Sequence, residues 1–147
     1  MKWVTRARPK TDRVGCPWLI KRFIDPEAEI LYVPSEQVLE IAEREGGRSF
    51  DAEGAEFTHR DGKCSFEVLA EEFDLMGDPG VERLARVVHA ADIKGELAND
   101  PLAAGLLAIA HGALEVEDDD YRLLERESFV YDALYAWAKG NPDQATP

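Results

Sequence analysis

The sequence lacks any apolar run close to the roughly 18 residues that a membrane-spanning helix needs. Its first residues also lack the charged-then-apolar pattern of a secretory signal, so we expect a cytoplasmic protein without membrane contact. The only cysteines are Cys16 and Cys64. Their wide separation fits neither a disulfide framework nor a paired zinc-ligand motif, and we therefore expect free thiols.

Familiar catalytic and nucleotide-binding motifs are also missing. The sequence has no glycine-rich phosphate loop, no G-x-S-x-G nucleophile elbow and no H-E-x-x-H helix. These absences give no reason to expect a nucleotide cofactor. They leave open whether the chain catalyses a reaction.

The chain is strongly acidic, but its charge is unevenly distributed. It has 17 Lys and Arg against 30 Asp and Glu, and this net charge of −13 argues against direct binding to nucleic acid or anionic lipid. Residues 1–22 are nevertheless basic, with Asp12 as their only acid. This segment either binds an oxyanion or pairs with the protein's own acidic side chains. The oxyanion-binding candidates are Arg6, Arg8, Arg13 and Arg22.

The length of 147 residues and the composition, 45% hydrophobic and 32% charged, are typical of one folded domain. We expect that domain to cover 1–147, with an ordered core at about 2–139 and a short polar tail. Strands are expected at 2–6 and 30–33, with shorter strand-like pieces at 48–50 and 55–57. Helices are expected at 12–25, capped by Asp12, and at 35–45, 64–73, 79–94, 101–114 and 119–138. The predicted fold class is α+β, a small β-sheet contributed mainly by the first half and helices dominating the second.

Two of the three histidines lie in polar surroundings that suit metal coordination. His89 and Asp92 are three residues apart in an expected helix, which places them on one face. Helical periodicity puts Asp92 in the apolar face, so we predict a buried carboxylate that needs a compensating cation. His59 lies at a strand end, and His59, His89 and Asp92 together suit a divalent zinc, iron or manganese ion. The alternatives are an internal His89–Asp92 pair or a bridge from Asp92 to an N-terminal arginine.

Four further side chains are weaker candidates. Glu56 and Cys64 lie close to His59 in the sequence, and Glu127 falls in the apolar face of the last helix, so each is a candidate additional ligand. Glu127 alternatively partners an arginine. Cys16 lies near a helix start with Arg13 nearby, an environment that lowers a thiol pKa and predicts a redox-reactive cysteine. Inert, buried packing is the alternative for both cysteines.

Several long stretches of the sequence resemble the ChrB chromate-resistance family. They are WVTRARPK at 3–10, DRVGCPWLIKRFIDP at 12–26, LYVP at 31–34, HRDGKCSF at 59–66, VHAAD at 88–92 and YDALYAW at 131–137. The resemblance covers nearly the whole chain and implies a bacterial protein of chromate resistance and stress response. The longer relatives act as chromate-responsive regulators of an efflux transporter and carry an additional DNA-binding-type region. Direct nucleic-acid binding is therefore not expected of this chain.

Three functional hypotheses follow. In the first, the chain is a sensor or binding domain for chromate or a related oxyanion, carries a histidine–carboxylate metal site and works with a regulatory protein partner. In the second, it is a metal-dependent enzyme with redox or hydrolytic chemistry at His59, His89 and Asp92. In the third, it is a structural or protein-interaction domain. The family motifs contain His59, His89 and Asp92, which favours a metal site.

Overall fold

A small parallel sheet forms the first part of the computed structural model, which describes residues 1–140. Its strands are β1 (Lys2–Arg6), β2 (Glu29–Val33) and β3 (Arg48–Ser49), in the spatial order β2-β1-β3. Parallel neighbours need crossover connections, which helices supply between β1 and β2 and between β2 and β3. The predicted piece at 55–57 forms only an isolated bridge, from Phe57 to Phe50.

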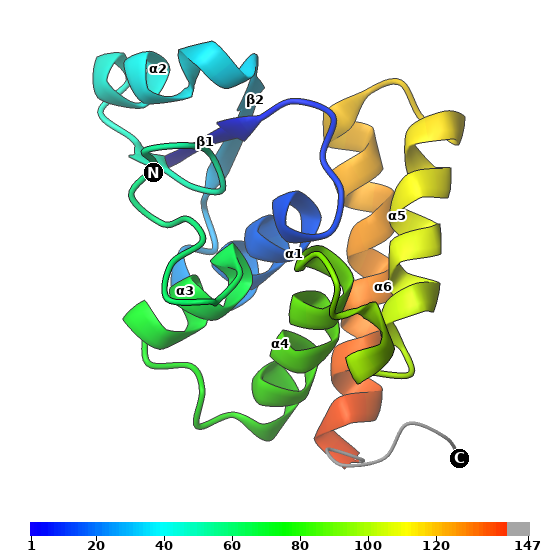
Figure 1. Cartoon of the computed structure of the whole chain (residues 1–147). Helices are drawn as coiled ribbons and strands as arrows, with labels where there is room; N and C mark the ends of the chain where they lie inside the picture. The colour runs from blue at the N-terminus through cyan, green and yellow to red at the C-terminus, as the bar shows by residue number, and fades with distance from the viewer. Residues whose placement is uncertain (141–147) are drawn as a thin grey trace.

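Helices make up most of the remaining described chain and dominate its second half, which confirms the predicted α+β class (Figure 1). None of the helices within 1–140 is both long and apolar enough to cross a membrane. The predicted tail follows residue 139, and its residues 141–147 lie outside the described part of the chain. The helical segments are α1 (Asp12–Leu19), the π-helical turn η1 (Ile20–Ile24), the 3-10 turn η2 (Ser35–Gln37), α2 (Val38–Arg44), α3 (Ser65–Glu72), α4 (Pro79–Asp92), the 3-10 turn η3 (Leu97–Asn99), α5 (Ala103–Val116) and α6 (Asp120–Gly140).

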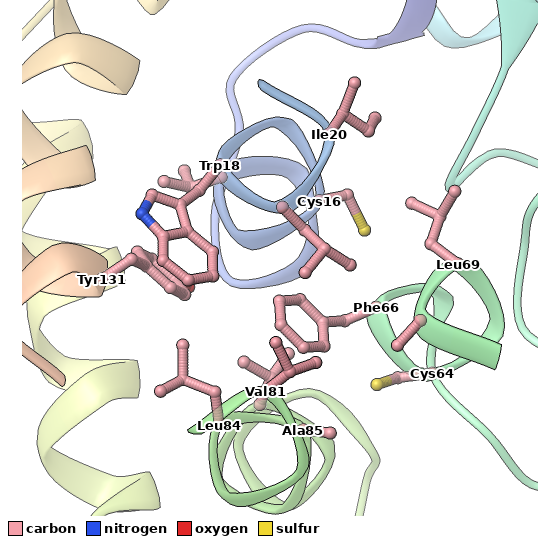
Figure 2. Packing of buried hydrophobic residues seen from close by; sticks show 14 of the residues in the cluster. Cys16, Trp18, Ile20, Cys64, Phe66, Leu69, Val81, Leu84, Ala85 and Tyr131 are labelled. Atoms are coloured by element: carbon pink, nitrogen blue, oxygen red, sulfur yellow. The ribbon is translucent and has the colours of Figure 1, made fainter. Parts of the chain in front are cut away.

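Helix α1 lies at the centre of the molecule, where it contacts α3, α4 and α6 (Figure 1). All its residues except Arg13 are buried, and Figure 2 shows Phe66 of α3 and Tyr131 of α6 packed in the core around it. A Cβ atom on Gly15 would lie 3.1 Å from Tyr131 and 3.2 Å from Phe66. The missing side chain therefore lets three helices approach one another closely.

Helix α4 begins as the sequence predicts. The Asp78 side chain accepts hydrogen bonds from the amides of Gly80 (2.8 Å) and Val81 (3.1 Å), and Pro79 occupies the first helical position. The helix ends at Asp92. This end position carries the Asp92 carboxylate to the start of α1.

Candidate metal centre

Asp12, the first residue of α1, is fully buried and holds α1 against α3. Its carboxylate oxygens accept hydrogen bonds from the backbone amides of Ser65 (2.8 Å) and Phe66 (3.1 Å). A helix N-terminus favours such a negative charge because its first amides have no partner within the helix. The prediction that Asp12 caps its own helix was wrong: Thr11 occupies that position, and Asp12 caps α3.

Three carboxylates converge on one nitrogen of His59. Its Nε2 atom lies 2.9 Å from Asp92 Oδ2, 3.2 Å from Asp12 Oδ2 and 3.5 Å from Asp51 Oδ1. The side chains of Asp12 and Asp51 are 0% and 6% exposed, that of Asp92 is 16% exposed, and that of His59 is 44% exposed. A single N–H group can donate well to only one of the three carboxylates at a time, so each carboxylate also depends on donors from elsewhere in the chain.

Asp51 is held beside His59 by donors on its other side. Ser65 Oγ donates to Asp51 Oδ1 at 2.6 Å, and Arg6 Nη2 donates to Oδ2 at 3.1 Å. Arg13 Nε lies 3.5 Å from the same Oδ2 atom. Sequence reasoning missed Asp51 because no local pattern marks it and its partners come from distant segments.

Asp92 is oriented by Thr11. Thr11 Oγ1 donates to Asp92 Oδ1 at 2.5 Å, which leaves Oδ2 directed at His59. The predicted burial of Asp92 was too strong, since its side chain remains partly exposed. As the last residue of α4, Asp92 lies at the edge of the apolar helix face, where α4 meets the loop before α1.

The protonation of this cluster reflects its crowding of negative charge. Hydrogen bonds with Asp12 and Asp51 raise the pKa of His59 to about 10. Burial raises the pKa of Asp12 to about 7, with Asp92 and Asp51 adding to the rise and His59 opposing it. Without a metal, the imidazolium of His59 is therefore the cation that the carboxylates share. The ligand atoms of Asp12, His59 and Asp92 all lie within 4.8 Å of one another, close enough to coordinate one ion instead.

The expected three-residue set is divided between two places. His59 and Asp92 lie together, whereas His89 belongs to a second group with Cys64 and Glu67, whose ligand atoms also lie within 4.8 Å of one another. His89 Nδ1 lies 2.5 Å from Glu67 Oε1. Its Nε2 atom pairs with Glu96. Burial lowers the pKa of His89, but the hydrogen bonds with these two glutamates raise it above its ordinary value overall.

Glu56 and Glu127 lie in neither group. Glu56 Oε2 pairs with Arg48 Nη2 at 2.6 Å near the surface. Glu127 is buried, as predicted, and burial raises its pKa to about 7. Among residues 1–140 its two carboxylate oxygens have no hydrogen-bond partner, so the alternative of an internal arginine pair is wrong.

Cys16 is fully buried in the core, as Figure 2 shows. Burial raises its pKa well above the ordinary value, and the nearby carboxylates of Asp12 and Asp51 add to the rise. The expected lowering of the thiol pKa by the helix start is thus outweighed by burial and by these carboxylates. The burial of Cys16 therefore favours inert packing in the core over redox reactivity.

The four N-terminal arginines each have acidic partners in the described part of the chain and occupy three different places. Arg6 and Arg13 both face Asp51, while Arg22 pairs with Asp132 at 3.2 Å. Arg8 Nη1 lies 2.9 Å from Asp120 Oδ1, and its guanidinium also donates to three carbonyl oxygens, of Leu114, Glu117 and Asp118. This arrangement matches the internal-pairing alternative and gives no common site for all four.

Comparisons with known proteins agree with this architecture. The sequence model described as "ChrB, C-terminal domain" matches residues 3–138. The protein named "Protein ChrB" of Cupriavidus metallidurans is 40% identical over 134 residues, which cover 91% of this chain and 40% of that relative. No solved structure matches the chain. The chain therefore belongs to the ChrB C-terminal domain family of chromate-resistance proteins and spans about 40% of the length of this curated relative.

Proposed function

We propose that this chromate-resistance domain binds a divalent transition metal through Asp12, His59 and Asp92. The observation that carries the proposal is the convergence of three carboxylates on His59 Nε2, all within 3.5 Å. Asp51 lies 3.5 Å from that nitrogen and completes the acidic side of the centre. The proposed ion takes the place that the imidazole proton occupies in the metal-free protein.

Simple electrostatics supports an ion here. Asp12 and Asp51 are almost fully buried, and ionised carboxylates in such positions are costly unless a cation compensates them. Oxygen-rich ligands with one imidazole suit manganese, iron or zinc. Three protein ligands leave coordination positions for water or another small molecule, on the side where His59 is exposed.

The proposed partner of the ion is chromate or a related oxyanion. The centre without metal repels anions because its carboxylates face His59, whereas a divalent ion provides a positive charge at the exposed side. Arg6 and Arg13 add positive charge behind Asp51. An ion held by Asp12, His59 and Asp92 would offer the oxygens of chromate an open coordination position, and the domain would act as a sensor or binding module in chromate resistance.

A metal-dependent enzyme is the second candidate function. The half-exposed His59 and the open coordination positions favour it, because catalytic metal sites keep a position for water or substrate. The binding domain and the enzyme would use the same metal. They differ in whether the bound oxyanion is released chemically unchanged. Incubation of the loaded protein with chromate, followed by measurement of chromium oxidation state, separates them.

Metal analysis of protein purified without a metal-affinity tag tests the proposal. We expect a manganese, iron or zinc ion that His59→Gln and Asp92→Asn lose and His111→Gln retains, since His111 is exposed on α5 outside both groups. Chelation should lower the melting temperature of the parent, because an ion bound only by the folded state stabilises it. A parent whose metal content and response to chelator match those of His59→Gln and Asp92→Asn would overturn the proposal.

A further inference from the structure

The second histidine group joins the start of α3 to the end of α4. Cys64 immediately precedes α3 and is fully buried, and Glu67 lies in the first turn of that helix. His89 lies in the last turn of α4, and Glu96 follows that helix. The Glu67 and His89 side chains are 19% and 23% exposed, so this group is far more enclosed than His59.

Helix capping accounts for part of this group. The Cys64 amide donates to Glu67 Oε1 at 2.9 Å, and the two residues form a capping box at the start of α3. Capping requires neither an imidazole nor a second carboxylate. Yet His89 Nδ1 lies 2.5 Å from the same Glu67 oxygen, and one ligand atom each of Cys64, Glu67 and His89 lie within 4.8 Å of one another.

The two ring nitrogens of His89 have different surroundings. The Nδ1 atom lies against Glu67, whereas Nε2 lies against Glu96. A histidine that binds a metal through one nitrogen usually donates its other N–H to a carboxylate, which fixes the orientation and tautomer of the ring. The pair formed by Glu96 and His89 has this arrangement.

We propose that Cys64 Sγ, Glu67 and His89 Nδ1 form a second metal site, which binds a thiophilic divalent cation of the zinc class. Glu96 is the positioning residue for His89. On binding, the Cys64 S–H bond breaks, its proton goes to solvent and the sulfur electron pair forms the metal–sulfur bond. His89 likewise gives up its Nδ1 proton, and neither the metal nor the protein changes oxidation state.

The ligand atoms distinguish this site from the proposed Asp12, His59 and Asp92 centre. A sulfur, a nitrogen and an oxygen suit zinc, cadmium or cobalt, whereas the other centre offers oxygen and nitrogen without sulfur. The two ligand sets share no residue, so this site can bind a metal whether or not the other centre does. A loaded second site would tie α3 to α4 and so stabilise the frame on which both groups are built.

Titration of the reduced, metal-free protein with Co²⁺ tests the site, because cobalt–thiolate bonds give an intense near-ultraviolet charge-transfer band. We expect this band in the parent and in Cys16→Ser. That variant is the matched control, because it removes the other cysteine and leaves Cys64 in place. Cys64→Ser and His89→Gln should lose it. Asp92→Asn should keep the band. Loss of metal binding at the Asp12, His59 and Asp92 centre is thereby distinguished from loss of metal binding at the Cys64, Glu67 and His89 site.

Two further measurements keep the test independent of how well Cys64→Ser folds. X-ray absorption of the cobalt-loaded parent should show one sulfur ligand, and Glu96→Gln should retain the band with about 10-fold weaker cobalt affinity. A parent without the charge-transfer band, or one whose cobalt has only nitrogen and oxygen ligands, would overturn the proposal. So would a band that persists in a folded Cys64→Ser protein.

Discussion

The two histidine groups share helix α4 but differ in how far apart their residues lie in the sequence and in their access to solvent. The Asp12, Asp51, His59 and Asp92 group draws on α1, the connection between β3 and α3, and α4, and it opens to solvent at His59. The Cys64, Glu67 and His89 group lies within α3 and α4 and their flanks, and Cys64 is fully buried. The open group suits exchange of a ligand at a metal, whereas the enclosed group suits a lasting structural ion.

The largest expected effect comes from removing the carboxylate that belongs to the open group and also holds α3. Asp12→Ala leaves the buried amides of Ser65 and Phe66 without their acceptor, so it should destabilise the protein by about 3 kcal/mol. Urea unfolding measures the loss. Asp12→Asn retains one acceptor and should lose less than half as much stability. Equal, small losses for both variants would show that Asp12 does not hold the helices together.

A substitution in α1 should affect the two groups differently. Gly15→Ala forces a methyl group against Tyr131 and Phe66 and should cost about 2 kcal/mol. Because Asp12 belongs to α1 and the enclosed group has no ligand there, manganese affinity should fall while the cobalt–thiolate band persists. Calorimetry and absorbance on one preparation measure the two effects. Parallel losses at both groups would contradict their independence.

Glu127 lies outside both groups and provides an internal control. Its folded pKa of about 7 lies above its ordinary value, so its contribution to stability is fully present below pH 4.5 and is lost as pH rises through 7. Glu127→Leu should therefore stabilise the protein by about 1 kcal/mol at pH 8, without change in metal binding. Exposed Glu125→Leu should have little effect. Loss of metal in Glu127→Leu would instead make Glu127 a ligand.

The smallest expected effect is the pH dependence of the metal-free protein, because solvent screens the exposed His59. The folded pKa of His59, about 10, lies above its ordinary 6.5. Its contribution is fully present below pH 6.5 and is lost as pH rises through 10. The melting temperature of the parent should therefore fall across this window more than that of His59→Gln. Identical pH profiles would remove His59 from the ion-pair cluster.

Local signals predicted much of the fold. The expected helix start at 79 is confirmed. It was predictable from local sequence because the capping side chain of Asp78, the proline that follows it and the capped amides all lie within four neighbouring residues. The short piece at 55–57 did not form a strand, since pairing depends on a partner that local sequence does not specify. Phe57 makes one bridge, to Phe50, before the chain turns away.

The site was predictable only where periodicity or polarity marked a residue. The meeting of His59 and Asp92 is seen as expected, but Asp12 and Asp51 depend on how α1 packs against α3. The three-residue separation of His89 and Asp92 predicted that they share one helix face. It did not show that the two side chains contact different segments of the chain. His89 meets the start of α3, while Asp92 meets the loop before α1.

The most direct test of the open group as a metal centre is calorimetric titration of metal-free protein with Mn²⁺, comparing the parent with His59→Lys. Lysine keeps a positive charge beside the carboxylates but, when protonated, has no lone pair for a metal. We predict that the parent binds one Mn²⁺ and melts at a higher temperature when loaded, whereas folded His59→Lys binds none. A parent that binds no more Mn²⁺ than His59→Lys, and whose melting temperature manganese leaves unchanged, would show that His59 serves only as an internal cation.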